Sequence, residues 1–239
     1  MKEKIADYWN YRSATYHGEY ADCMDEEIEL WKQIFAEILP SGKKLRAVEV
    51  GTGPGLLAMA LSGMGHDVTG IDLSEEMLKK ASSNAEKRGL KIRFMPGDAE
   101  ALPLESGEYD LILSKYLLWT LPSPEKFLGE CNRLLTQNGM MIAIDGLWFN
   151  KSANESEKKD EKDTWSAYFE ECYKDIKPHL PLGKDNTAEK IISLAEQHGF
   201  TEANWQGMKK YNAFLLKHDP KGYAASYSEP PYLISAKKL

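Results

Sequence analysis

Cysteine is scarce in this sequence, and the three that occur, Cys23, Cys131 and Cys172, lie far apart with no CxxC pair. An odd number of scattered cysteines argues against a disulfide framework and against a thiolate zinc site. The five histidines are equally scattered, and no HExxH motif occurs. We therefore expect no metal site.

Long apolar runs are also lacking. No stretch approaches the roughly 18 apolar residues that a membrane-spanning helix needs, and the N-terminal MKEKIADYWN has no apolar signal-peptide core. Acidic residues outnumber basic ones by 37 to 30, for a net charge of −7, whereas nucleic-acid binding favours a basic face. We expect a cytoplasmic monomer or homodimer that binds neither membranes nor nucleic acids.

The sequence does contain a regular alternation of short apolar runs and helical patterns, which is typical of a parallel sheet with crossover helices. Strands are expected at 47–50, 67–72, 92–95, 109–114, 140–145, 203–206 and 232–236. Helices are expected at 56–63, after Ser74, after Ser123 and after Thr187. The pattern predicts an α/β fold, a Rossmann-like seven-stranded, mostly parallel sheet with flanking helices.

The polar and apolar patterns divide the chain further. Residues 1–39 are expected to form a helical N-terminal cap, since Ile28, Trp31 and Phe35 share one helical stripe. We expect a cofactor-binding core at 45–145, an acidic, aromatic-containing lid insertion at 146–186, and a C-terminal helix and final strands at 187–239. All four parts are predicted to belong to a single domain, 1–239.

The segment VEVGTGPG (48–55) joins the first strand to the first core helix. Its glycines at 51, 53 and 55 allow a sharp turn and the close approach of a ligand. Its spacing differs from the dinucleotide GxGxxG and from the P-loop, and no lysine is present to meet a phosphate. The loop suits a nucleoside that carries an amino acid better than it suits a pyrophosphate.

Two acidic positions follow at strand ends. Asp72 ends the second strand, where an acid of this fold accepts hydrogen bonds from both ribose hydroxyls. In GDAEALP (97–103), Asp98 and the backbone of Ala99 are placed to meet an adenine edge. The loop and the two acids, in this order, predict an adenosyl site.

Four segments, VEVGTGPG, GIDLSEEML, GDAEALPLESGEYDLILS and LLTQNGMMIAID, resemble in order the core motifs of class I S-adenosylmethionine-dependent methyltransferases. The resemblance is to the small-molecule branch that includes the ubiquinone and menaquinone biosynthesis methyltransferases, and it covers residues 45–145. YWNYRSATYHG also resembles the N-terminal YWxxRAxxYD segment of that branch, although His17-Gly18 replaces its acid.

The resemblance implies an enzyme that transfers a methyl group from S-adenosylmethionine to a small-molecule acceptor and releases S-adenosylhomocysteine. It places the methionine part of the cofactor on the glycine loop, the ribose on Asp72 and the adenine by the residues that follow. The implied cofactor residues are Tyr11, Arg12, Tyr16, Gly51, Thr52, Gly53, Gly55, Asp72, Leu73, Met77, Asp98, Ala99, Glu100 and Ser114.

Aromatic residues gather after the fourth and fifth strands, where ligand crevices lie in open α/β sheets. The expected acceptor-binding residues are Tyr116, Trp119, Trp148, Trp165 and Phe169, and packing of a cap helix explains any one of them equally well. His17, Tyr116 and His179 are candidates for a general base. The alternatives are a protein or tRNA methyltransferase and a non-catalytic partner subunit that binds S-adenosylmethionine.

Overall fold

The structure is a computed structural model that describes residues 1–16, 23–147, 164–183, 185–218 and 229–239, the side chains of 164–167 excepted. The helices are α1 (Lys2–Arg12), α2 (Met24–Ile38), α3 (Leu56–Gly63), α4 (Glu75–Lys87), α5 (Pro124–Leu134), α6 (Thr164–Tyr173), α7 (Ala188–Gln197) and α8 (Lys209–His218), with short 3₁₀ turns η2 (Leu118–Thr120) and η3 (Lys177–His179). The strands are β1 (Arg46–Val50), β2 (Asp67–Asp72), β3 (Arg93–Pro96), β4 (Tyr109–Lys115), β5 (Leu135–Asp145), β6 (Phe200–Gly207) and β7 (Tyr232–Lys238).

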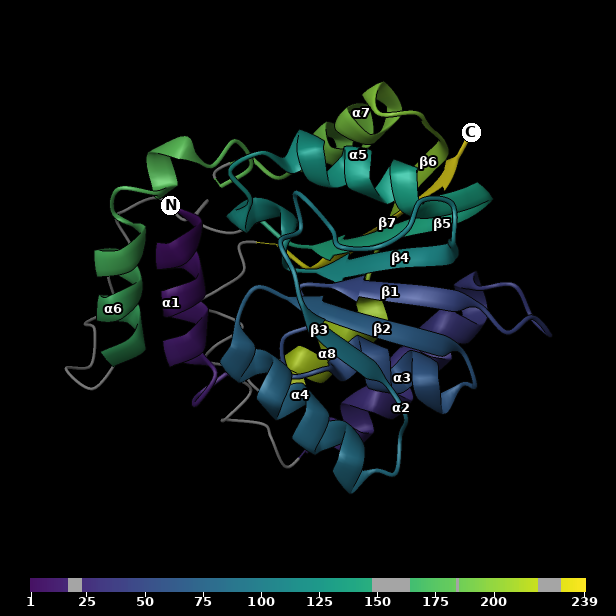
Figure 1. Cartoon of the computed structure of the whole chain (residues 1–239), viewed down its shortest axis with the longest axis horizontal. Coiled ribbons are helices and arrows are strands. Elements are labelled where there is room, and N and C mark those ends of the chain that lie inside the picture. The colour runs from purple at the N-terminus through teal and green to yellow at the C-terminus, as the bar shows by residue number, and fades with distance from the viewer. Residues whose placement is uncertain (17–22, 148–163, 184, 219–228) are drawn as a thin grey trace.

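The strands form one seven-stranded sheet in the order β3-β2-β1-β4-β5-β7-β6 (Figure 1). The first five strands of the chain run parallel, and β7 pairs antiparallel with both β5 and β6. Because β1 leads to β2 on one side while β4 lies on its other side, the strand order reverses between β1 and β4. The Rossmann-like fold class expected from the sequence is confirmed.

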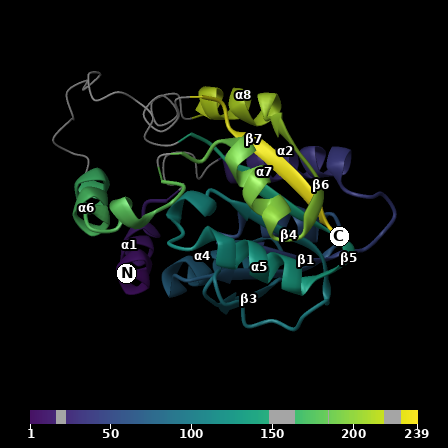
Figure 2. The same cartoon turned by 90° about the horizontal axis from the view of Figure 1, so that it is seen from above.

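Helices cover both faces of the sheet (Figures 1 and 2). The strand residues alternate between the two faces. In β4, Leu111 and Leu113 pack in the cluster that includes α2, α3 and α8, whereas Ile112 packs in the cluster that includes α5 and α7. Successive strand side chains point to opposite faces, so a strand covered on both sides reads as a continuous apolar run. The buried layers fix the strand ends that build the site.

Most predicted elements occur close to their expected positions. Helix α3 has the predicted bounds, and the hydroxyl of Ser74 accepts a hydrogen bond from the Met77 N–H at 3.1 Å at the start of α4. The strand expected at 140–145 begins earlier, at Leu135. Its pairing with β4 is irregular between Leu135 and Met140, where Asn138 has a φ of 60°.

Helices α1 and α6 lie side by side at one end of the molecule (Figures 1 and 2). Their contact is aromatic: the Tyr8 ring lies 5.3 Å from that of Phe169 and 5.2 Å from that of Tyr173. Helix α2, which the sequence grouped with α1 in a cap, packs instead on α3. The division into cap, core and lid remains a prediction, and residues 148–163 of the expected lid lie outside the described residues.

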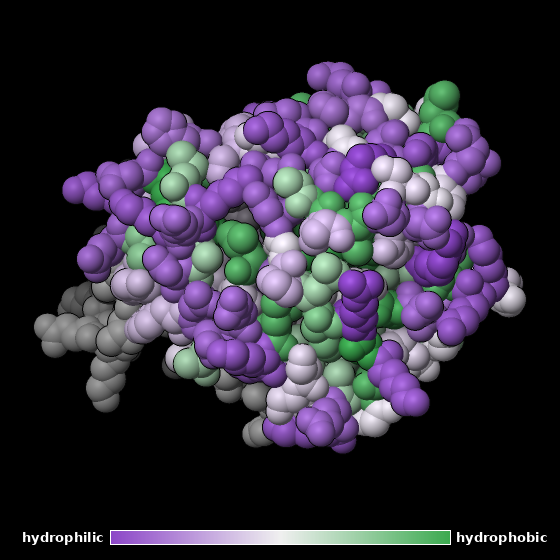
Figure 3. Space-filling model, in the orientation of Figure 1, coloured by the Kyte–Doolittle hydropathy of each residue, from purple (hydrophilic) through white to green (hydrophobic). Residues whose placement is uncertain are grey.

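The outer surface seen in Figure 3 carries hydrophilic residues around its rim, with hydrophobic residues grouped between them. Among the described residues, no helix combines the length and the apolar character that crossing a membrane requires.

Candidate functional site

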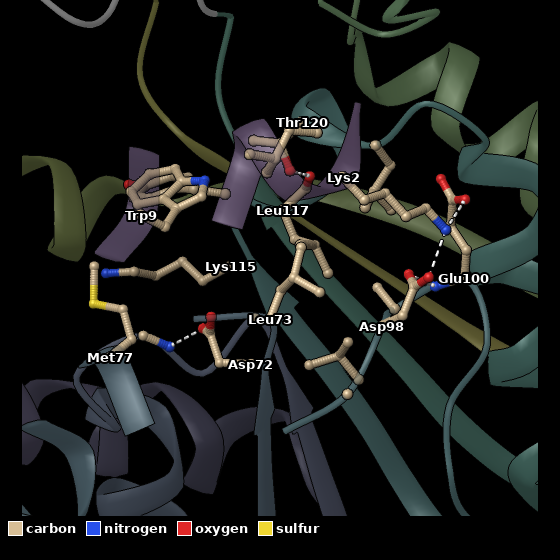
Figure 4. Close-up of a pocket in the computed structure, with 18 of the residues that line it drawn as sticks. Lys2, Trp9, Asp72, Leu73, Met77, Asp98, Glu100, Lys115, Leu117 and Thr120 are labelled. Carbon is tan, nitrogen blue, oxygen red and sulfur yellow. Dashed lines mark hydrogen bonds and ion pairs between the residues drawn. The ribbon is translucent and has the colours of Figure 1, made fainter. Parts of the chain in front are cut away.

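A pocket lies at the carboxyl ends of β1, β2, β3 and β4 (Figure 4), with an empty volume of about 780 Å³ that includes space open to solvent. It includes the residues that follow each of these strands, from Gly51, Leu73, Gly97 and Tyr116 onwards. The strand order reverses between β1 and β4, and in open α/β sheets this switch point is where ligands bind. The topology therefore places the glycine loop and both acids predicted from the sequence at one cavity.

The glycine loop has the backbone that its sequence predicts. Gly51, Gly53 and Gly55 have φ values of 70°, 52° and 86°, in the left-handed region that side chains disfavour. Among the described residues, a Cβ atom on Gly53 would meet only Tyr16 Cε1, at 4.0 Å, whereas one on Gly55 would lie 3.1 Å from the Cβ of Ala81. Gly53 therefore leaves open space beside the pocket, while Gly55 lets the loop pack on α4.

Asp72 joins the glycine loop to the start of α4. Its Oδ2 accepts a hydrogen bond from the Gly53 N–H at 2.7 Å, and its Oδ1 accepts one from the Ser74 N–H at 2.9 Å. Burial raises the pKa of Asp72, and these backbone donors oppose that rise. Each carboxylate oxygen retains a second lone pair, so Asp72 can also accept hydroxyl groups from a ligand.

Glu49 supports the same loop from behind. It is 2% exposed, and its Oε2 accepts hydrogen bonds from the Thr52 hydroxyl at 2.6 Å and from the Ala58 N–H at 2.8 Å. Burial raises the pKa of Glu49 to about 7, against the opposing effect of these hydrogen bonds. The side chain of Thr52 is thus turned towards Glu49.

The acids after β3 are held by the first helix. The Lys2 ammonium lies 2.5 Å from Asp98 Oδ2 and 2.7 Å from Glu100 Oε2. Asp98 Oδ1 accepts the Glu100 N–H at 2.9 Å, and Glu100 Oε1 accepts the Ser123 N–H at 2.6 Å. In Figure 4, Lys2, Asp98 and Glu100 lie at one end of the pocket, and Trp9 and Lys115 lie at the other.

Two further contacts hold α1 and the residues after it over the pocket. The Ser74 hydroxyl donates a hydrogen bond to Asn10 Oδ1 at 2.7 Å, and the Lys80 ammonium donates to the carbonyl oxygens of Ser13 and Tyr16, both at 2.8 Å. Ser74 caps α4 and follows the pocket residue Leu73, and Lys80 lies in the second turn of the same helix. The N-terminal helix is therefore part of the pocket wall.

Lys115, at the end of β4, is a buried cation that the sequence reasoning missed. Its side chain is 8% exposed, its ammonium lies 2.9 Å from the Tyr211 hydroxyl and 3.5 Å from Glu27 Oε1, and it lines the pocket. Burial lowers the pKa of Lys115, while the charges of Glu27 and Glu49 oppose this. The sequence does place this lysine directly after the apolar run 111–113, at the carboxyl end of a buried strand. Because lysine is rarely buried, its position there could have marked it as a candidate site residue.

Tyr116, the next residue, has a φ of 58°, which is uncommon for a residue other than glycine. Its N–H donates to the Ile144 carbonyl oxygen at 2.8 Å, so pairing with β5 holds this conformation. Backbone strain of this kind costs about 1–3 kcal/mol and is often found at functional sites. This backbone conformation of Tyr116 ends β4 where the strand reaches the pocket.

Most of the predicted cofactor residues come together in the pocket wall. Those that line it are Tyr16, Gly51, Gly53, Asp72, Leu73, Met77, Asp98, Ala99 and Glu100. Those that lie outside the lining are Tyr11, Arg12, Thr52, Gly55 and Ser114. Ser114 is buried within β4, and Tyr11 is 45% exposed, with its ring 4.4 Å from that of Tyr168. The binding roles themselves remain predictions.

The predicted acceptor residues are more dispersed. Tyr116 lines the pocket, whereas Trp119 and Phe169 are buried in the aromatic cluster between α1 and α6. Trp148 and the side chain of Trp165 lie outside the described residues. Of the base candidates other than Tyr116, His179 is exposed in η3, away from the pocket, and His17 lies outside the described residues.

Several lining residues had no sequence prediction: Lys2, Ile5, Trp9, Lys115, Leu117, Thr120, Leu121 and Pro122. Lys2 meets Asp98 across 96 positions of the chain, a separation for which a local pattern carries no signal. Trp9 lies in the YWNYR segment, whose family resemblance indicated a cap but did not single out this ring.

A model of the methyltransferase domain family matches residues 48–143. The ubiquinone biosynthesis O-methyltransferase of Caulobacter sp. (strain K31) is 36% identical over 99 residues, which are 41% of this chain and 39% of that protein. The chain thus matches about two fifths of the length of this relative. The uncharacterized methyltransferase YcgJ of Bacillus subtilis (strain 168) is 26% identical over 213 residues, covering 81% of this chain and 84% of that protein.

Solved structures share the architecture. The phosphoethanolamine N-methyltransferase 2 of Haemonchus contortus, in complex with phosphomonomethylethanolamine and S-adenosylhomocysteine, has a TM-score of 0.64 at 17% identity. The similarity covers 88% of this chain and 52% of that one. At this level of identity the likeness shows the fold alone.

Proposed function

We propose that this chain, which belongs to the methyltransferase family, transfers a methyl group from S-adenosylmethionine to a small-molecule acceptor and releases S-adenosylhomocysteine. The observation that carries the proposal is the position of Asp72. Its carboxylate lies at the end of β2, accepts the Gly53 N–H at 2.7 Å and lines the pocket at the switch point of the sheet. An acid at this position is suited to a ribose.

The residues of the pocket fit the cofactor. The space beside Gly53, where a Cβ would first meet protein at 4.0 Å, leaves room for a ligand against the loop backbone. Asp72 would hold the ribose, and Asp98 and Ala99 would meet the adenine, as the family resemblance implies.

When bound, S-adenosylmethionine supplies a methyl group activated by its sulfonium. The protein's part is to orient the acceptor and to exclude water. Helix α1 serves the second task, since Lys2 and Asn10 fasten it across the pocket and Ile5 and Trp9 form part of the lining. The ring of Tyr16 also lines the pocket, where an aromatic face favours a cation.

The acceptor end of the pocket is proposed to lie by Lys115 and Tyr116. Lys115 is the lining group placed to exchange a proton with an acceptor: burial lowers its pKa, and the charges of Glu27 and Glu49 oppose this fall. The hydroxyl of Tyr211 and the carboxylate of Glu27 hold its nitrogen in place. We assign Lys115 this role in preference to His179, which is exposed and outside the lining.

The experiment that tests the proposal follows a labelled methyl group. The protein is incubated with methyl-labelled S-adenosylmethionine and a cell extract divided into metabolite, protein and RNA fractions. The proposal expects label in the metabolite fraction and release of S-adenosylhomocysteine. Label confined to protein or RNA would contradict the small-molecule assignment. Binding of S-adenosylhomocysteine without label in any fraction would indicate the non-catalytic alternative.

A further inference from the structure

A second cluster of reactive side chains lies where α2 begins and α8 ends, formed by Cys23, Glu26 and His218. The Cys23 sulfur lies 2.9 Å from His218 Nδ1, and His218 Nε2 lies 3.3 Å from Glu26 Oε2. Cys23 immediately precedes the first residue of α2, and His218 is the last residue of α8. None of the three lines the pocket described above.

The order of the groups is that of a nucleophile, a base and an acid that orients the base. Nδ1 of His218 contacts the thiol, while Nε2 is buried, lies 3.3 Å from Glu26 Oε2 and makes no hydrogen bond with a described residue. The imidazole can therefore accept the thiol proton, and the nearby carboxylate of Glu26 stabilises the cation that results. Cys23 is the N-cap residue of α2, where the helix N-terminus favours a negative sulfur, while the acids Asp25, Glu26 and Glu27 of the first turn oppose it. Cys23 is partly exposed and not in a disulfide, so a small reagent can reach it.

The His218 ring is held in this position. Its side chain is 13% exposed, and its ring centre lies 4.5 Å from that of Phe214. Glu26 also accepts a hydrogen bond from the Lys217 ammonium at 2.8 Å, which restrains the carboxylate. A base with a fixed ring and a fixed acid partner loses little freedom when it takes up a proton.

The same three residues form a group that could in principle hold a metal ion. The ring orientation favours the thiol–imidazole pair instead. A metal takes one nitrogen of a histidine, whereas here opposite nitrogens of His218 face the sulfur and the carboxylate. A separation of 2.9 Å is also shorter than expected for a sulfur and a nitrogen on one tetrahedral zinc, with bonds of ≈ 2.3 and ≈ 2.0–2.1 Å.

We propose that Cys23 is a modification site that forms a mixed disulfide with a low-molecular-weight disulfide, with His218 as its base. The proton of the thiol passes to Nδ1 of His218, and the sulfur attacks one sulfur of the disulfide. The new S–S bond forms as the old one breaks. The departing thiolate takes the proton from His218, so that one disulfide and one thiol give one mixed disulfide and one free thiol.

The other two cysteines provide controls within the chain. Cys131 is fully buried, and burial raises its pKa well above the usual range, so it is expected to be inert. Cys172 is partly exposed, as Cys23 is, and lies on α6. The side chain of Cys172 is hydrogen-bonded to Tyr168, so the rate at Cys172 gives the reference for a partly exposed thiol that lies beside a phenol and not beside an imidazole.

The test is to incubate the full chain with glutathione disulfide at pH 7 and to follow each cysteine by peptide mass spectrometry. We expect Cys23 to react about tenfold faster than Cys172. His218→Ala should lower the Cys23 rate to that of Cys172, while His179→Ala, at an exposed histidine elsewhere, should leave it unchanged. Glu26→Gln alters an exposed residue and is expected to slow Cys23 several-fold without affecting folding.

Equal rates at Cys23 and Cys172 in the unaltered protein would overturn the proposal. So would a Cys23 rate that neither His218→Ala nor Glu26→Gln changes. The same incubation after addition of zinc chloride and gel filtration tests the metal alternative. Retained zinc that protects Cys23, and is lost in His218→Ala, would overturn the modification site in favour of a metal site.

Discussion

Replacing Asp72 with alanine removes the carboxylate that we expect to hold the ribose and that ties the glycine loop to α4. In the free protein the change has opposing effects. The N–H groups of Gly53 and Ser74 lose their acceptors, at 2.7 Å and 2.9 Å, but a charge whose burial raises its pKa is also removed. We therefore expect a small change in thermal stability and a large change in cofactor binding.

The magnitude follows from the bonds that the carboxylate makes with a ligand. A hydrogen bond to a charged acceptor contributes about 1.5–3 kcal/mol. Because water replaces part of the lost interaction, we expect Asp72→Ala to weaken binding of S-adenosylhomocysteine by about 1–3 kcal/mol, or roughly 5- to 150-fold in Kd. Loss of loop order would add to this.

Asp72→Asn separates charge from shape. Both carboxylate oxygens face backbone N–H donors, from Gly53 and from Ser74, so the amide NH₂ of asparagine must face one of them. We expect this variant to bind almost as weakly as the alanine variant. Asp67→Ala is the matched control, because it removes an exposed aspartate from the other end of the same strand.

The assay is isothermal titration calorimetry with S-adenosylhomocysteine, supported by thermal unfolding of each variant without ligand. Asp67→Ala should bind like the unaltered protein. If Asp72→Ala folds and binds with unchanged affinity, the assignment of Asp72 is wrong. NAD, titrated in parallel, is expected to show no binding.

Three further changes test the loop and the first helix. Burial raises the pKa of Glu49 to about 7, so the folded protein holds a proton that the unfolded chain releases. Its free energy of unfolding should therefore fall as the pH rises from 4.5 to about 7, by at most ~3 kcal/mol. Urea titrations across this range should show a weaker pH dependence for Glu49→Gln than for the unaltered protein. The same pH dependence in both proteins would refute the reasoning. Gly53→Val should fold but fail to bind S-adenosylhomocysteine. The control is Gly107→Val, where the φ is 70° and there is open space around the residue, and this variant should bind normally. Equal binding by both variants would contradict the role of Gly53 as a contact surface for the ligand. Lys2→Met should speed hydrogen exchange in α1 and weaken binding of S-adenosylhomocysteine several-fold. Lys4→Met, which breaks an exposed ion pair at 3.4 Å, should change neither. Equal protection of α1 from hydrogen exchange in the two variants would show that Lys2 does not hold the helix in place.

The parts of the fold that local patterns encode could be predicted from the sequence. The apolar run of α3 and the capping serine of α4 depend on neighbours within a few residues, and both occur as expected. Helix α8 was not predicted, because its apolar residues Tyr211, Phe214 and Leu215 make a weak stripe among lysines. Its packing against α2 stabilises it in the structure.

The same distinction holds for the site. The glycine loop and Asp72 belong to strand ends, so the order of elements alone placed them together. The contacts of Lys2 with Asp98 and of Lys115 with Glu27 join segments far apart in the chain, and only the folded structure brings them together. The sequence therefore predicted the glycine loop and Asp72 better than it predicted the contacts that Lys2 and Lys115 make around the pocket.

A crystal structure of the protein grown with S-adenosylhomocysteine would show directly where the cofactor binds. We expect ligand density in the pocket, against the backbone of Gly53, with the ribose at Asp72 and the adenine by Asp98. Density at another place, or an empty pocket at saturating ligand, would show that these strand ends do not form the cofactor site.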